Sequence, residues 1–89
     1  MKLELIKSNE KGKTYQADGF KIFYRFKNTV SGDNSENLNE QIYLISGEAL
    51  VTVNSDTISI EAPRTIEIPA KTYHKIEAQT DIVFILYES

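Results

Sequence analysis

The chain has 89 residues, of which 40% are hydrophobic, and its 10 basic and 13 acidic side chains leave a net charge of -3. This length allows one domain with one core. The chain contains no cysteine, which excludes disulfides, thiolate metal sites, iron–sulfur clusters and a cysteine nucleophile. The basic residues form no dense cluster, so nucleic acid is not an expected partner.

The first residues, MKLELIKSNEKGK, contain Glu4 and Glu10 among the lysines and lack the apolar run of a signal peptide. No segment approaches the roughly 20 apolar residues that cross a bilayer. We therefore expect a soluble, cytoplasmic protein without a membrane partner.

Apolar and polar residues alternate with a period of two along most of the chain, which predicts β-strands throughout. Turn-forming residues separate the strands. The expected strands are residues 3–7, 14–17, 21–27, 41–46, 49–54, 57–60, 65–68, 75–78 and 82–87. Within residues 40–53 we expect two strands folded back on each other around Gly47. Many short strands at regular spacing are typical of a sandwich or a barrel.

Residues 28–39, NTVSGDNSENLN, form the longest stretch without a strand pattern. Four Asn, two Ser and one Gly make it too polar for a buried strand and too rich in turn formers for a helix. We expect a mobile loop at the mouth of the barrel, where binding residues concentrate.

Several expected strands are apolar on both faces. Residues 82–87 read IVFILY, residues 20–26 read FKIFYRF, and residues 42–45 read IYLI. A strand of a small monomeric barrel has a polar outer face, so these runs indicate that the outer face is covered. Because no helix is expected, we predict a homodimer formed through one sheet.

Glu40 lies seven positions before Gly47, and Pro69 lies five positions before His74. At these spacings the two segments resemble the signature motifs of the cupin superfamily, whose members are small antiparallel jelly-roll barrels. The first family motif is G-x5-H-x-H-x3,4-E-x6-G. Six residues, QIYLIS, separate Glu40 from Gly47 as this motif requires. The two histidine positions fall on Asn34 and Glu36, and the leading glycine position falls on Asn28.

The second family motif, G-x5-P-x-G-x2-H-x3-N, matches Pro69 and His74. Lys71 stands at its inner glycine, Pro63 at its leading glycine and Ala78 at its terminal asparagine. The resemblance implies an all-β, cupin-like antiparallel jelly-roll β-barrel that occupies residues 1–89 as a single domain.

In this family, three histidines and one glutamate usually hold a divalent metal inside the barrel, such as Mn, Fe, Ni or Zn. The corresponding residues here are Asn34, Glu36, Glu40 and His74. The first three share strand parity, so an extended segment would turn them the same way. Such an oxygen-rich set favours Mn2+, Mg2+ or Ca2+ over Zn2+. The alternative is a chain without a metal, because two imidazoles are lost and a lone histidine beside a carboxylate is most often a structural pair.

Strand alternation sends Ile42 and Leu44 inward with Glu40, and Ile76 inward with His74. Glu40 and His74 can also act as a general acid–base pair without a metal. Four tyrosines offer flat surfaces that suit a sugar, a small aromatic ligand or a dimer interface: Tyr24, Tyr43, Tyr73 and Tyr87. By parity, Tyr43 and Tyr73 face outward, and we assign Tyr24 with Glu40 and His74 to ligand binding.

Three functions remain open. We favour the binding of a small polar ligand, of sugar or organic-acid size, in the barrel interior. The second is a metal-dependent isomerase, epimerase or oxygenase, which the resemblance implies, with Glu36, Glu40 and His74 as ligands. The third is a structural or regulatory dimer module. The sequence contains neither a phosphate-binding loop nor a nucleophile elbow.

Overall fold

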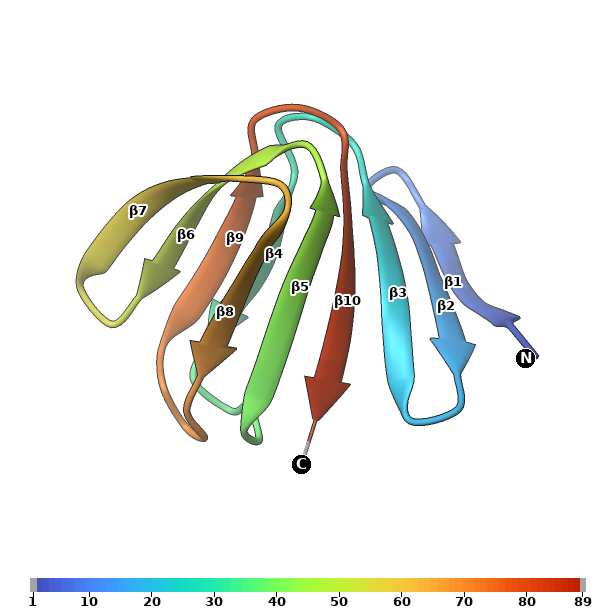
Figure 1. Cartoon of the computed structure of the whole chain (residues 1–89), viewed down its shortest axis with the longest axis horizontal. Helices are drawn as coiled ribbons and strands as arrows, with labels where there is room; N and C mark the ends of the chain where they lie inside the picture. The colour runs from blue at the N-terminus through green and yellow to red at the C-terminus, as the bar shows by residue number, and fades with distance from the viewer. Residues whose placement is uncertain (1, 89) are drawn as a thin grey trace.

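The computed structural model describes residues 2–88, and within them all regular structure is β-strand (Figure 1). Met1 and Ser89, the ends of the predicted domain, lie outside the described residues. Nothing within residues 2–88 forms a helix with the length and apolar character needed to span a membrane. The strands are β1 (Glu4–Asn9), β2 (Gly12–Ala17), β3 (Phe20–Arg25), β4 (Val30–Asn34), β5 (Glu40–Ser46), β6 (Glu48–Val53), β7 (Asp56–Glu61), β8 (Arg64–Ile68), β9 (His74–Ala78) and β10 (Ile82–Glu88).

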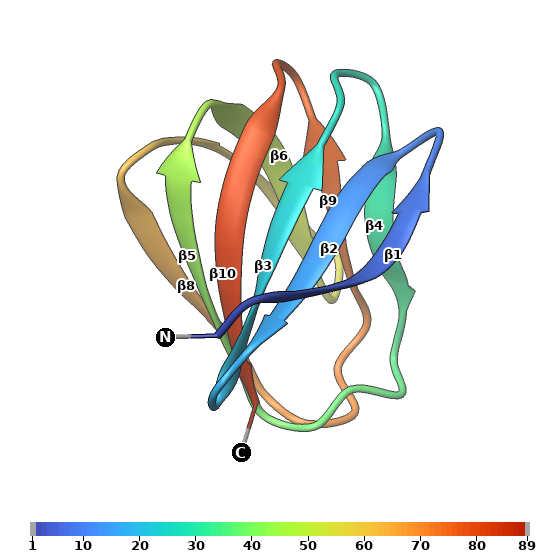
Figure 2. The ribbon, with the colours of Figure 1, turned by 90° about the vertical axis from the view of Figure 1, so that its right-hand side faces the viewer.

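Two antiparallel sheets face each other and form a sandwich (Figures 1 and 2). The larger sheet has six strands in the order β1-β2-β3-β10-β5-β8, and the smaller has four in the order β4-β9-β6-β7. The chain crosses repeatedly between the sheets, which is the connectivity of a jelly roll. The predicted all-β antiparallel fold is confirmed.

The core lies between the sheets and holds ten buried apolar residues, all on inward-facing positions: Ile42, Leu44, Ala49, Val51, Ile60, Ile68, Ile76, Ala78, Ile82 and Phe84. The predicted inward residues Ile42, Leu44 and Ile76 are only 3%, 2% and 5% exposed. Each fully buried side chain of this size contributes about 1.5–3 kcal/mol to folding. The core therefore follows the period-two pattern of the sequence.

The expected hairpin around Gly47 is wrong, although both of its strands form. β5 lies between β10 and β8 in the larger sheet, whereas β6 lies between β9 and β7 in the smaller one. Gly47 has φ +95°, a conformation open mainly to glycine, and turns the chain from one sheet into the other. Each strand thus finds its backbone partners in strands that are distant in sequence.

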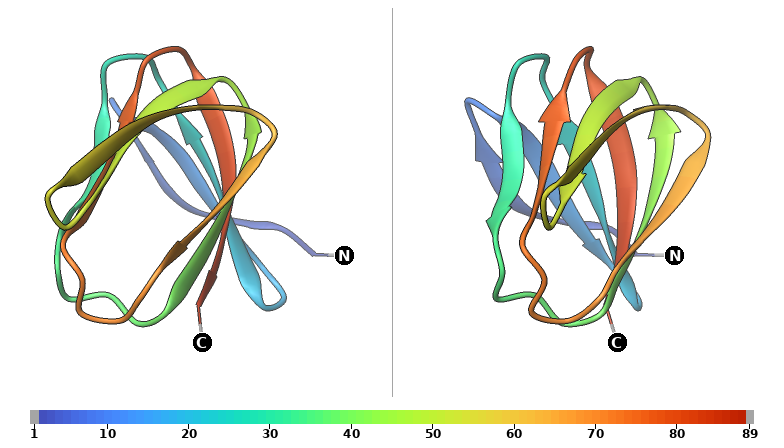
Figure 3. Two further views of the ribbon diagram at one scale, coloured as in Figure 1. Left: turned by 60° about the vertical axis from the view of Figure 1, so that its left-hand side comes forward. Right: turned by 90° about the vertical axis from the view of Figure 1, so that its left-hand side faces the viewer.

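The expected loop at residues 28–39 is only partly a loop. Val30–Asn34 form β4, which pairs with β9 at the edge of the smaller sheet. An edge strand gains backbone hydrogen bonds on one side while its side chains stay in water, so a polar sequence is tolerated there. Residues 35–39 do run outside the sheets, beside the segment that joins β8 to β9 (Figure 3).

Apolar side chains also lie outside the sandwich, on the outer face of the larger sheet. Leu5, Tyr15, Ile22, Ile85 and Tyr43 are successive register partners across five neighbouring strands. Tyr43 lies between buried Ile42 and Leu44 on β5, faces outward and is 39% exposed. This row, the outer apolar row, accounts for the doubly apolar strands of the sequence.

Candidate functional site

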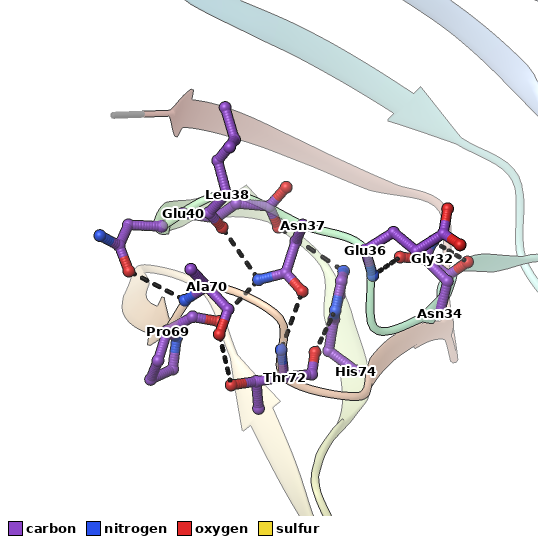
Figure 4. Close-up of polar contacts among 11 residues, drawn as sticks. Gly32, Asn34, Glu36, Asn37, Leu38, Glu40, Pro69, Ala70, Thr72 and His74 are labelled. Carbon is purple, nitrogen blue, oxygen red and sulfur yellow. Dashed lines mark hydrogen bonds and ion pairs between the residues drawn. The ribbon is translucent and has the colours of Figure 1, made fainter.

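The structure brings Glu40 and His74 together inside the sandwich (Figure 4). Glu40 is the first residue of β5 and His74 is the first residue of β9. The two residues therefore come from different sheets and lie at the same end of the sandwich. His74 Nε2 lies 3.5 Å from Glu40 Oε1, and the two side chains are only 6% and 10% exposed.

The hydrogen bonds of His74 assign its protons. Its Nδ1 lies 3.0 Å from the backbone oxygen of Thr72. Because a carbonyl oxygen only accepts, Nδ1 carries a proton and donates it. In a neutral ring Nε2 is then a bare acceptor facing the Glu40 carboxyl, and that approach is favourable only with a proton between them. At 3.5 Å between Nε2 and Oε1, the two side chains make an electrostatic contact between an imidazole and a carboxyl.

The surroundings of Glu40 favour its protonated form. Burial is the largest influence and raises the pKa of the Glu40 carboxyl. The charge of His74 lowers this pKa, the charge of Glu88 raises it, and the charge of Lys21 lowers it. Glu88 is the register partner of Glu40 on β10. On balance the pKa of Glu40 is raised, so this residue holds a proton at a higher pH than an exposed glutamate does.

A cavity of about 430 Å3 opens beside the pair. Its polar lining comes from Ser31, Asn34, Glu36, Asn37, Glu40, His74 and Glu88. An apolar wall is formed by Phe23, Ile42, Ile76, Phe84 and Leu86. Among the described residues that line it there are carboxylates and an imidazole but no lysine or arginine. The cavity therefore suits groups that donate hydrogen bonds or carry positive charge.

Asn37 links residues 35–39 to the segment between β8 and β9, next to the site. Nothing in the sequence indicated this residue. It is 8% exposed, and its side-chain amide nitrogen donates to the backbone oxygen of Pro69 at 2.7 Å. Its side-chain oxygen accepts from the backbone nitrogen of Thr72 at 3.1 Å. Since Thr72 in turn accepts from His74, Asn37 positions the imidazole through the chain between β8 and β9 (Figure 4). An asparagine within an Asn-rich segment carries no sequence signal for this role.

Asn34 and Glu36 do not complete a metal site. Asn34 uses its side chain locally, donating to the backbone oxygen of Gly32 and accepting from the backbone nitrogen of Glu36. The parity argument fails here because the chain leaves the sheet after Asn34 and turns before Glu40. Glu36 does line the cavity, but as an exposed residue.

The residues present do not fit the divalent metal that the family resemblance implies. Within residues 2–88 no three side chains of His, Cys, Asp or Glu are placed to hold one ion together. Glu40 and His74 supply two ligands, whereas protein metal sites usually take three or four from the chain. The predicted set of Asn34, Glu36, Glu40 and His74 is therefore not assembled.

Tyr24 is not part of the site. It alternates along β3 with Phe23, which faces the cavity, and it is 46% exposed on the outer face. Its ring makes an edge contact with Tyr15 at 5.7 Å between centroids. The predicted outward positions of Tyr43 and Tyr73 are confirmed, at 39% and 36% exposure.

No protein-family profile and no curated protein matches this chain. Several solved structures do match it. The capsular polysaccharide assembling protein CapF from Staphylococcus aureus superposes with a TM-score of 0.82 over 98% of this chain, at 16% identity. Salicylate 1,2-dioxygenase from Pseudaminobacter salicylatoxidans gives a TM-score of 0.73 over 78% of the chain, at 14% identity. The chain has the cupin fold.

A third cupin-fold structure is the conserved SPY1581 protein of unknown function from Streptococcus pyogenes, with a TM-score of 0.69 over 79% of this chain, at 21% identity. The chain spans 28% of the CapF chain, 20% of the dioxygenase chain and 63% of the SPY1581 chain. At these identities the likeness establishes the fold alone.

Proposed function

We propose that this cupin-fold chain binds a small polar ligand in the cavity beside Glu40 and His74. The proposal is supported by one observation above all: a carboxyl and an imidazole, each at least nine-tenths buried, face each other on the wall of an open cavity. Placing these two polar groups in the interior costs free energy. A purely structural barrel would gain stability from apolar residues at both positions.

The lining decides the chemistry of the ligand. Glu36 and Glu88 give this cavity a negative character, which repels a free organic acid and attracts hydroxyl groups or an ammonium group. Its volume of about 430 Å3 falls in the range of small-molecule sites. A neutral sugar, a polyol or a small amine is the ligand that fits.

A thermal-shift screen followed by NMR titration tests this proposal. Neutral sugars, polyols and small amines are added to the wild type, and a ligand of the site raises the melting temperature in a saturable way. Binding should be lost in His74→Ala and weakened in Glu40→Gln. Glu67→Gln removes an exposed carboxylate of β8 and should bind like the wild type. A ligand that saturates all these proteins equally would refute the assignment of the site.

A second candidate is proton transfer on the bound ligand, and the facing carboxyl of Glu40 and imidazole of His74 favour it. In such a reaction the carboxylate or imidazole removes a proton from a carbon acid and the same pair returns one. Incubation of an identified ligand in D2O would then place deuterium on its carbon, and His74→Ala would abolish the exchange. Binding without exchange would refute this second candidate and leave only the proposal of ligand binding.

We also propose that the chain is a homodimer that stacks through the outer apolar row. Four strand spacings make this row about 19 Å wide, and a second copy presents the same flat face, as a two-fold interface requires. A two-fold axis parallel to the strands would lay the outer apolar row of one copy against the same row of the other.

A further inference from the structure

A second cavity of about 430 Å3 opens on the β1–β3 side of the sandwich, which faces the viewer in Figure 2. Lys7 of β1, Lys11 of the β1–β2 turn and Arg25 of β3 line it together with residues 30–33 of β4. Its lining has the opposite charge to that of the Glu40–His74 cavity. Asp33 is the acidic residue of this lining, and its carboxylate accepts a hydrogen bond from the Tyr73 hydroxyl.

Arg25 is a buried cation without an acidic partner. It is 9% exposed, and its Cζ lies 4.8 Å from the ring centroid of Phe23. No carboxylate in the described part of the chain, residues 2–88, forms an ion pair with it. Burial lowers the pKa of this guanidinium. A buried charge of this kind is costly unless something of the opposite sign compensates it.

The hydrogen bonds of Arg25 leave part of its guanidinium free. Nη1 donates to the backbone oxygens of Lys13 and Tyr24, and Nη2 donates to the Thr14 hydroxyl. A guanidinium has five N–H donors in a planar fork. Nε finds no partner among residues 2–88 and is itself buried, so a small shift of the side chain toward the cavity has to expose it, and one N–H of Nη2 is left over. Two such donors from neighbouring nitrogens suit the two oxygens of a carboxylate or phosphate.

The lysines add charge at the entrance. Both Lys7 and Lys11 are exposed, and Lys11 Nζ donates to the backbone oxygen of Val30 at 3.2 Å. That contact holds one ammonium group beside β4, at the cavity. Exposed ammonium groups attract an anion from solution and lower the cost of bringing it to the buried guanidinium.

We propose that the Arg25 cavity binds the anionic group, a carboxylate or a phosphate, of a small molecule. The proposal stands apart from ligand binding at Glu40 and His74, since it rests on different side chains. The two cavities nevertheless share Phe23, Ser31 and Gly32 in their linings. A molecule with an anionic end and a hydroxylated or amine-bearing end therefore matches the charges of both.

Nitrogen-15 NMR tests the Arg25 cavity directly, because the Nε–H group of Arg25 has its own signal. Inorganic phosphate and acetate are titrated separately into the wild type at low ionic strength, with sodium chloride as the reference salt. We expect a saturable shift of the Arg25 Nε–H signal and of the Ser31 and Gly32 amides. A response that is absent, or that chloride reproduces, would overturn the proposal.

A pair of double variants then separates a site from general charge. Lys7→Gln with Lys11→Gln leaves Arg25 in place and should weaken phosphate binding about threefold to tenfold, as expected for two exposed cations. Lys13→Gln with Lys27→Gln removes the same charge from exposed positions outside this lining and should leave the affinity unchanged. Equal affinity in both double variants would also overturn the proposal.

Discussion

Gly32 lies against the imidazole of His74. A Cβ atom on Gly32 would come 3.0 Å from Cδ2 and 3.2 Å from Nε2 of that ring. The backbone of Gly32 also has φ +86°, a conformation that residues other than glycine rarely adopt. Edge strand β4 therefore helps to set where the imidazole lies, because glycine there leaves the ring room to reach Glu40.

Gly32→Ala should displace the His74 ring, and Gly19→Ala provides a matched control. Gly19 has the same φ of +86°, and a Cβ there meets nothing within 4 Å. Both variants carry backbone strain of about 1–2 kcal/mol, but only the first adds a steric clash, worth about 1–3 kcal/mol more. Urea unfolding measures the difference, and the NMR signals of the His74 ring should move in Gly32→Ala alone. Equal losses with an unmoved ring would show that the contact is unimportant.

Asn37→Ala should destabilise the protein by about 1–3 kcal/mol, because it leaves the Pro69 carbonyl and the Thr72 amide without their partner. Asn39→Ala is the comparison, since exposed Asn39 accepts a single hydrogen bond from the Ala70 amide, at 2.8 Å. That loss should cost about 0.5–1.5 kcal/mol. Chemical denaturation ranks the two variants. If Asn39→Ala proved the more damaging, Asn37 would not be the main link between these segments.

Glu40→Gln should change how stability depends on pH. Since the pKa of Glu40 is raised in the folded protein, the fold favours the neutral carboxyl. That contribution is fully present below the unfolded pKa of about 4.3 and is lost as pH rises through the higher folded value. The variant stays neutral at every pH, so its unfolding free energy relative to the wild type should rise across this window. Glu67→Gln controls for loss of a surface charge, and a relative stability that falls with pH would contradict the prediction.

Tyr43→Lys should convert the proposed dimer to a monomer. It places a charge within the outer apolar row, where stacking would bury it without a partner. Ile58→Lys makes a similar change at a 44% exposed position of β7, in the other sheet, and should leave the dimer intact. Size-exclusion chromatography with light scattering should give twice the chain mass of 10.1 kDa for the wild type. A monomeric wild type, or equal behaviour of the two variants, would exclude this interface.

The sequence by itself determined which side of most strands is buried. Ile42 and Leu44 face the core while Tyr43 between them faces out, because neighbouring side chains of a strand point to opposite faces. The spacing of Glu40 from Gly47 and of Pro69 from His74 indicated the cupin fold and the two residues at the centre of the site. These features are local, so the order of residues is enough to predict them.

Only the tertiary structure decided how distant segments meet. The alternation of inward and outward side chains did not predict where Glu36 lies, because the chain leaves the sheet after β4. The pairing of β5 with β8 and β10, rather than with β6, depends on which strands compete for its edges. The contacts of Asn37 with Pro69, and the lack of an acidic partner for Arg25, follow from the packing of the two sheets. Such contacts join residues far apart in the chain, and no periodic pattern in the sequence records them.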